Sequence, residues 1–201
     1  MTRFATHALR LTLVATIASG CASTRLVNTW QDPKYSGPSL TRIMVIDVTK
    51  QAGIRRTFED EFVRQLDAKG VRAVASYTLI PEDGAVAKER LAEAVKESGV
   101  QSVLITRLVR VETQTQIYAG SYPPPYYGFY GYYSWAWVGY YDPPQIYTYD
   151  VVIAETNLFD ASSDTLIWSG TTETFPSRDV KQGIGRFASV IIQALSAGHI
   201  I

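Results

Sequence analysis

The apolar run RIMVIDV at residues 42–48, together with the pattern that follows it, most restricts the fold of this chain. A strand that is apolar at nearly every position is typical of a sheet covered on both faces. The next segment carries large apolar residues at intervals of four and then a helix-stopping glycine: Ile54, Phe58, Phe62, Leu66 and Gly70. That spacing predicts the buried stripe of an amphipathic helix, and hence the first half of a βαβ unit.

The alternation of predicted strands and helices continues along the chain. Residues 71–79 and 100–113 are predicted as strands, and the second of them is long enough to project beyond a sheet. Between them, a helix starting near PEDG has one face formed by Ala87, Leu91, Ala94, Val95 and Ser98, with Gly99 as its C-terminal cap. Because βαβ crossovers are right-handed, the first three strands are expected to be parallel.

The C-terminal third predicts a hairpin and a helix. Residues 146–161 and 164–175 are expected strands around the turn DASSD, whose Asp and Ser side chains supply local hydrogen bonds. A wide apolar stripe from Val180 to Leu195 predicts the last helix, with Ser177 as its N-cap and Gly198 at its end. The close pair Gly183 and Gly185 indicates tight packing of this helix against the sheet.

The predicted fold class is therefore α/β. We expect a single two-layer domain over residues 42–201, with a mixed sheet of about five strands in the order β-α-β-α-β-β-β-α and helices packed on it. Residues 21–41 are expected to form a tether or an edge strand. Residues 118–146 are expected to form an insertion loop rich in Tyr, Pro and Gly.

The most unusual part of the chain lies in that insertion. Of the 23 residues from 122 to 144, 11 are aromatic, 5 are proline, and Asp142 carries the only charge. Prolines favour extended backbone and glycines oppose a stable helix, so no helix is expected here and Trp135 and Trp137 would share one side of an extended segment. The candidate binding residues are Tyr126, Tyr127, Tyr130, Tyr132, Tyr133, Trp135, Trp137, Tyr140 and Tyr141.

Three interpretations of this aromatic segment stay open. It is a low-complexity loop without a ligand, a surface that docks on a membrane or a protein partner, or a stacking platform for the sugar rings of an envelope glycan. Tyr and Trp favour boundaries between wet and dry regions, which is the reason for the second interpretation.

The first twenty residues have the pattern of a secretion signal. A basic segment with Arg3 and Arg10 precedes the short apolar run LTLVATIAS, which is far below the roughly 20 residues that a membrane-spanning helix needs. Small residues then lead to Cys21, the only cysteine in the chain. Residues 1–20 are therefore expected to be a cleaved signal peptide, with the cut between Gly20 and Cys21.

The sequence ASGC at residues 18–21 resembles the bacterial lipobox, although Ala18 stands where leucine is usual. The resemblance implies that the Cys21 sulfur receives a diacylglyceryl group and that the new amino terminus is acylated, with palmitate as the expected acyl group. Because Ala22 and not Asp follows the cysteine, sorting to the outer membrane is implied, with the protein facing the periplasm. The membrane is then a partner through the lipid anchor.

Other segments resemble a family of uncharacterised bacterial outer-membrane lipoproteins that is known only as a domain of unknown function. They include NTWQDPKYSGP, RRTFEDEFVRQL, SYTLIPEDG, VLITRLV and LFDASSDTLIWSG. The order of elements is similar to the amino-terminal domain of TolB and to curli-secretion and penicillin-binding-protein-activator lipoproteins. Topological similarity of this kind does not fix function.

The residue content argues against most enzyme classes. Only His199 remains after the leader, and Cys21 would carry lipid, so nucleophile–histidine systems and His/Cys metal sites are not expected. No cofactor is expected apart from the covalent lipid. Equal numbers of basic and acidic residues, 19 of each, give no reason to expect nucleic-acid binding. The oligomeric state is left open.

Carboxylates are the remaining candidates for chemistry. Glu59, Asp60 and Glu61 are expected on the solvent face of their helix, because Phe58 and Phe62 occupy the buried face. Asp150 and Glu155 lie near the aromatic segment. The expected function is a non-enzymatic accessory or interaction module of the envelope, with an envelope protein or glycan as partner. The alternative is an enzyme that acts on envelope polysaccharide or peptidoglycan through carboxylates near the loop.

Overall fold

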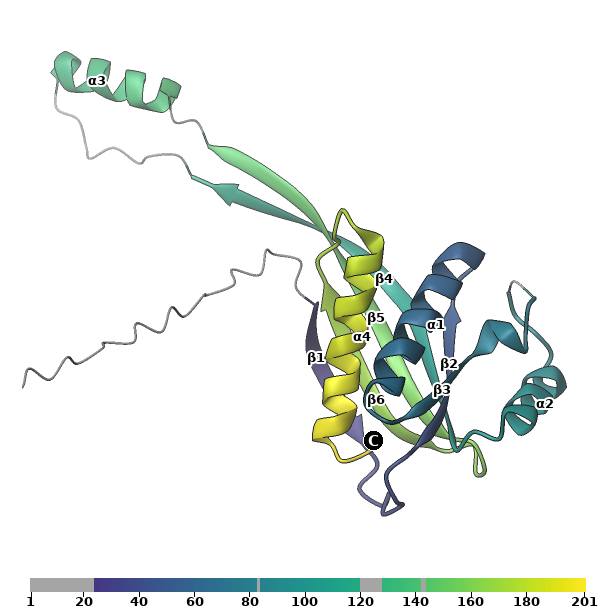
Figure 1. The fold of residues 1–201 in the computed structure, drawn as a ribbon. Coiled ribbons are helices and arrows are strands. Elements are labelled where there is room, and N and C mark those ends of the chain that lie inside the picture. Colours follow the sequence, from purple (N-terminus) through teal and green to yellow (C-terminus); the bar gives the residue numbers. More distant parts are fainter. Residues whose placement is uncertain (1–23, 83, 120–127, 142–143) are drawn as a thin grey trace, which may run out of the picture.

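The computed structural model describes residues 24–82, 84–119, 128–141 and 144–201, which form an α/β domain with a long projecting arm (Figure 1). One mixed sheet has the strand order β1-β6-β5-β4-β2-β3. Its strands are β1 (Thr24–Gln31), β2 (Arg42–Val48), β3 (Arg72–Ala75), β4 (Ser102–Tyr118), β5 (Gln145–Asp160) and β6 (Leu166–Thr174). The helices are α1 (Ala52–Asp67), η1 (Ser76–Thr78), α2 (Lys88–Ser98), α3 (Gly128–Tyr141) and α4 (Val180–Ala197).

The predicted fold class and strand directions are confirmed. β2 pairs in parallel with both β3 and β4, and β4, β5 and β6 pair in antiparallel order, as expected for βαβ crossovers followed by a hairpin. The sheet has six strands, because residues 24–31 pair with β6 as an edge strand and do not form a loose tether.

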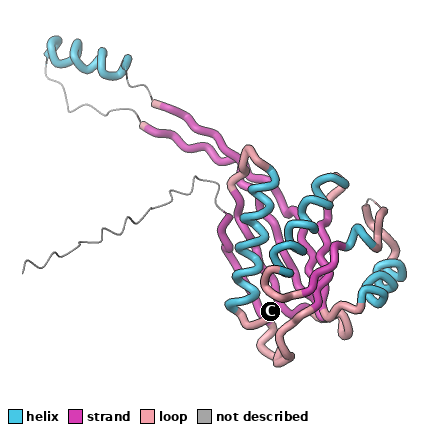
Figure 2. The backbone as a smooth tube through the Cα atoms, viewed as in Figure 1, coloured by secondary structure: helices cyan, strands magenta, loops and turns pink. Residues whose placement is uncertain are grey.

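Helices cover both faces of the sheet. α1 and α4 lie side by side over one face and bury the main hydrophobic core, to which alternate residues Ile43 and Val45 of β2 contribute (Figure 2). On the other face, Met44 and Val103 pack with α2 and the η1 region in a second, smaller cluster. α2 thus adds a partial third layer over β2 and β4, where two layers were expected, and this explains the apolar character of RIMVIDV at successive positions.

The core between α1 and α4 is built on three aromatic rings. The ring centroid of Phe62 lies 4.8 Å from that of Phe58 and 6.1 Å from that of Phe187. As expected from the two helical stripes, Phe62 and Phe187 are buried on adjacent helices. Gly185 brings the α4 backbone close to α1, where its carbonyl accepts a hydrogen bond from Gln65 at 2.8 Å. The glycine therefore serves helix-on-helix packing and not the expected contact with the sheet.

Several element ends differ from the predictions for local reasons. The strand expected at 71–79 ends at Ala75, where the chain turns into η1. α2 begins at Lys88 and not at PEDG, while Gly99 caps it in the left-handed conformation as predicted. The N-cap of α4 is Asp179, whose side chain accepts from the Gln182 N–H at 3.0 Å, whereas the Ser177 hydroxyl accepts from the N–H of Asp179 just before the helix.

β4 and β5 continue far beyond the other strands, as Figure 1 shows. The outermost row that still includes β1 and β6 pairs Thr24 with Thr174, Thr174 with Val152, and Val152 with Val111. Beyond it, the described residues 112–118 and 145–151 form a two-stranded ribbon that leads to α3. These residues and α3 are called the arm. None of the helices in the described part of the chain is both long and apolar enough to cross a membrane.

Candidate functional site

The structure places five of the nine aromatic candidates with their side chains. Tyr130, Tyr132, Tyr133, Trp137 and Tyr140 lie on α3 with exposed side chains. Trp135 and Tyr141 belong to the same helix, but their side chains lie outside the described part of the structure. Gly20, Cys21, Tyr126 and Tyr127 also lie outside the described residues.

The expectation that residues 118–146 contain no helix is wrong, because 128–141 form α3. Ring contacts at helical spacing run along it: Tyr133 and Trp137 have centroids 6.1 Å apart, and Trp137 and Tyr140 are 5.9 Å apart. Pairs three or four residues apart face each other on a helix, whereas residues two apart do not. The extended backbone on which the predicted alignment of Trp135 and Trp137 depended is therefore replaced by a helix.

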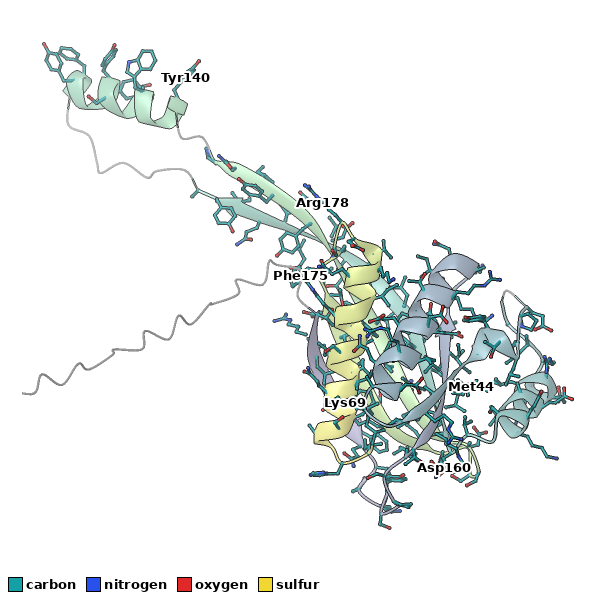
Figure 3. The ribbon with its side chains drawn as sticks, viewed as in Figure 1. Met44, Lys69, Tyr140, Asp160, Phe175 and Arg178 are labelled. Atoms are coloured by element: carbon teal, nitrogen blue, oxygen red, sulfur yellow. The ribbon has the colours of Figure 1, made fainter. Side chains whose placement is uncertain are left out.

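Among the described residues of the arm, charged side chains lie only near its base. There, Arg107 pairs with Glu155 at 2.6 Å, Arg110 pairs with Glu112, and Asp150 accepts a hydrogen bond from Thr113 at 2.8 Å. Farther out, the described segments 114–118, 128–141 and 145–149 contain no charged residue. These three segments are called the distal arm. Figure 3 shows Tyr140 at its tip and Phe175 near the base of the arm.

The expectation that Glu59 faces solvent is wrong. Its side chain is completely buried, while Asp60 is exposed as expected and Glu61 is partly buried in a surface pair with Arg64. Glu59 Oε1 accepts from Arg55 Nε at 3.0 Å, from the Ser76 hydroxyl at 2.8 Å and from the Asp47 N–H at 3.1 Å. These donors replace the water that the carboxylate loses on burial.

The guanidinium of Arg55 completes this buried network. It donates to the Ser76 hydroxyl at 2.9 Å, to the Ile80 carbonyl at 3.0 Å and to the Glu82 carbonyl at 2.8 Å. The pair thereby ties α1 to the end of β2 and to the segment that follows β3. Because every charged atom is used within the fold, the arrangement is structural and offers no free group for catalysis.

Next to this network, Asp47 lines a groove of about 570 Å³ between the amino-terminal ends of α1 and α4. The groove lies at the carboxyl end of β2, beside the domain part of β4, and its walls include Phe58, Thr106, Leu108 and Phe187. In open α/β sheets, ligands commonly bind at this end of the strands. Burial, and after it the nearby charge of Glu59, raises the pKa of Asp47 to about 7, while Arg55 acts in the opposite direction.

Replacement of Asp47 by asparagine is expected to change how stability depends on pH. The raised pKa means that the folded state binds a proton between about pH 4 and pH 7 that the unfolded state has released, so wild-type stability falls as pH rises through this window. Asp47→Asn should remove that fall and make the variant relatively more stable above pH 7. Urea unfolding at several pH values measures it, with Asp150→Asn, at an exposed position, as the control. Parallel pH curves for Asp47→Asn and wild type would contradict the assignment.

The two carboxylates predicted near the aromatic segment already have partners on the surface of the sheet. Glu155 pairs with the opposite residue Arg107, and Asp150 accepts from the opposite residue Thr113. The DASSD turn closes as a hairpin, since Asp160 Oδ1 accepts from the backbone N–H groups of Ser162 and Ser163 at 2.8 and 2.9 Å. In the part of the chain that the structure describes, no group of three or more His, Cys, Asp or Glu residues is placed to hold a metal ion.

No family model matches the chain, and no curated protein matches it. Among solved structures, a PelC dodecamer from Paraburkholderia phytofirmans is 17% identical with a TM-score of 0.42, over 88% of this chain and 96% of that chain. The dodecamer of a single-residue variant of the same protein is 16% identical with a TM-score of 0.42, over 85% and 96%. Lipoprotein GNA1162 from Neisseria meningitidis is 13% identical with a TM-score of 0.41, over 80% and 99%. Similarity at this level assigns no function.

Proposed function

We propose that this chain is a lipid-anchored accessory protein of the bacterial cell envelope that acts by binding and not by catalysis. The observation that carries the proposal is the arm, which presents exposed aromatic side chains at its tip. α3 contributes no residue to either of the two core clusters found among the described residues. A large exposed aromatic surface that the core does not use is typical of an interaction site.

The proposed anchor is Cys21, which resembles a lipobox cysteine and follows a secretion signal. It precedes Thr24, the first residue of β1, by three positions. Three residues span at most about 11 Å, so an acylated Cys21 would hold the domain close to the membrane. Ala22 after the cysteine favours the outer membrane as the location, with the domain in the periplasm.

Binding is favoured over catalysis by the state of the carboxylates. Glu59 is used within the buried network, and Asp150 and Glu155 are paired on the surface of the strands. Hydrolysis of a glycan by the usual mechanism needs two carboxyl groups about 5–10 Å apart across a substrate cleft. Asp47 lines the groove at the carboxyl end of β2, but its neighbour Glu59 is enclosed in the buried network and cannot serve as the second carboxyl group there. An envelope protein, a glycan or a membrane surface is the proposed partner of the arm.

The anchor has a direct test. Cys21→Ser removes the sulfur that would accept the diacylglyceryl group, so the variant should remain an uncut or unacylated precursor that carries no lipid at this position. Mass spectrometry of the purified mature chain should find acylated Cys21 in the wild type. When inner and outer membranes are separated, the wild-type protein should be found in the outer membrane. An unmodified Cys21, or an amino terminus at another residue, would contradict the lipoprotein assignment.

Replacement of residues 119–144 by Asn-Gly tests the arm. Tyr118 pairs with Gln145, so a two-residue turn can join them directly. We expect the melting temperature to stay within a few degrees of wild type, because α3 is absent from both cores. We also expect retention of the chain on isolated bacterial envelopes to be lost in a Cys21→Ser background. A variant that does not fold would show that the arm belongs to the core, and unchanged retention would show an idle loop.

A further inference from the structure

The arm leaves the domain at the end of the sheet where Thr24, the first described residue, lies. Thr24 stands in the outermost row of the sheet that still includes β1 and β6, and its hydroxyl lies 3.1 Å from that of Thr174. The same row continues through Val152 to Val111, beyond which only β4 and β5 extend among the described strands. β1 runs away from this row, so the chain enters the domain from the side of the arm (Figure 1).

The arm is longer than the tether that would precede β1. From Val111 to Tyr118 the ribbon rises about 3.4 Å per residue, or about 24 Å in all, and α3 adds to that reach. Cys21 is held within about 11 Å of Thr24. A domain anchored through Cys21 therefore brings the distal arm against the bilayer, where it either lies along the surface or enters the headgroup layer.

The chemistry of the distal arm suits that layer. It has no charged residue, and Ile117 and Ile146 are each 66% exposed next to the ring pair of Tyr118 and Tyr147, whose centroids are 5.4 Å apart. Tyr and Trp rings are enriched where membranes meet water, since their bodies are apolar and their tips are polar. α3, with 14 residues, is too short to span a hydrocarbon core of about 30 Å.

The ribbon has little support from the other described strands. Along residues 112–118 and 145–151, β4 and β5 pair with each other, and none of the other described strands pairs with them. An isolated two-stranded ribbon is only marginally stable in water. Burial of its exposed apolar side chains in a lipid interface contributes about 25 cal/mol per Å² of apolar surface removed from water.

We propose that the distal arm docks into the headgroup layer of a phospholipid membrane. The inference deepens the proposed function and rests on it for the identity of the membrane, which is the one that would hold acylated Cys21. Contact with lipid through the arm itself does not require the anchor. Residues 114–149 carry a single charge, Asp142, so binding is predicted to depend little on ionic strength, because there is little charge to be screened.

The test uses residues 21–201 with Cys21→Ser, so that no acyl chain contributes. This chain should float with vesicles of phosphatidylethanolamine and phosphatidylglycerol, to a similar extent at about 50 and about 500 mM salt. Tyr133→Glu with Tyr140→Glu should reduce binding by about tenfold or more, because charged groups enter a lipid interface at a cost. The matched control is Val27→Glu with Val180→Glu, two exposed positions outside the arm.

A second measurement tests lipid contact without the Tyr133→Glu and Tyr140→Glu substitutions, so it does not depend on whether that variant folds. Vesicles with brominated acyl chains should quench the tryptophan fluorescence of the unaltered arm, and Trp137→Phe should reduce that quenching. Absence of flotation would overturn the proposal. Vesicle binding that survives the double substitution would also overturn it. The same holds if the chain binds no vesicles but self-associates through α3 in sedimentation, or if it is retained on peptidoglycan alone. If the chain binds vesicles but Cys21 of the natural protein carries no lipid, the proposal for the arm is supported and the proposed anchor is refuted.

Discussion

Glu59→Ala is expected to lower the free energy of unfolding by about 3–5 kcal/mol, the usual effect of removing one partner from a buried ion pair. The substitution leaves the guanidinium of Arg55, which is 6% exposed, without its counter-charge. It also removes the acceptor of the Ser76 hydroxyl and of the backbone N–H groups of Asp47 and Tyr77. Urea unfolding at neutral pH measures the loss.

Glu93→Ala is the matched control, because Glu93 is also a helical glutamate paired with an arginine. Its side chain is 71% exposed and lies 3.5 Å from Arg90, so the expected loss is below about 1 kcal/mol. Equal losses for the two variants would show that Glu59 is not enclosed as described. Replacing the pair together with apolar residues of similar volume is expected to cost much less than Glu59→Ala, since no buried charge is then left unpaired.

Phe62→Ala is expected to lower the free energy of unfolding by about 3–5 kcal/mol through the cavity it leaves. Phe62 is fully buried and its ring contacts both Phe58 on its own helix and Phe187 on α4. These rings join the two helices, so the cavity cannot close without moving one helix against the other. Thermal and urea unfolding should both report the change.

The control for this variant is Phe129→Ala on α3, where the ring is 70% exposed. The same atoms are removed, but little buried surface is lost, so the expected change is within about 0.5 kcal/mol. A Phe62→Ala variant that melts within a degree or two of wild type would mean that the buried face of α1 is assigned wrongly.

The framework of the fold was predictable because its signals are local and periodic. The stripes of α1 and α4 place Phe62 and Phe187 in the core, and the βαβ rule gives the directions of β2, β3 and β4. The sixth strand was harder to predict, since residues 24–31 are mostly exposed and their pairing with β6 depends on a contact far away in sequence.

The burial of Glu59 was not predicted, because residues spaced four apart do not stay on one face of a helix with 3.6 residues per turn. Arg55, Glu59, Phe62 and Leu66 follow the tighter spacing of four, three and four, which places the ion pair in the middle of the buried face. That spacing is visible in the sequence, and an arginine and a glutamate four residues apart within it are placed to pair on the same face of the helix. Their partner Ser76 lies in the short helix η1, which no periodic pattern in the sequence predicts.

The aromatic helix α3 was missed for a different reason. Composition argued against it, because glycine weakens helices and aromatic residues have modest helix propensity. Ring contacts between side chains three and four residues apart, such as Tyr133 with Trp137, supply stabilisation that single-residue propensities omit. The sequence therefore pointed to an exposed aromatic segment at the right place in the chain but to the wrong backbone conformation.

The direction of β1 has a mechanical consequence. Tension applied at Thr24 acts along β1, whose ladder with β6 reaches from Thr24 to Gln31. Hydrogen bonds in an antiparallel ladder lie perpendicular to the strands, so such a load is shared by all of them at once and does not open them one after another. Force that reaches the domain through its amino terminus would thus be carried into β6 and β5, and through β5 into the base of the arm.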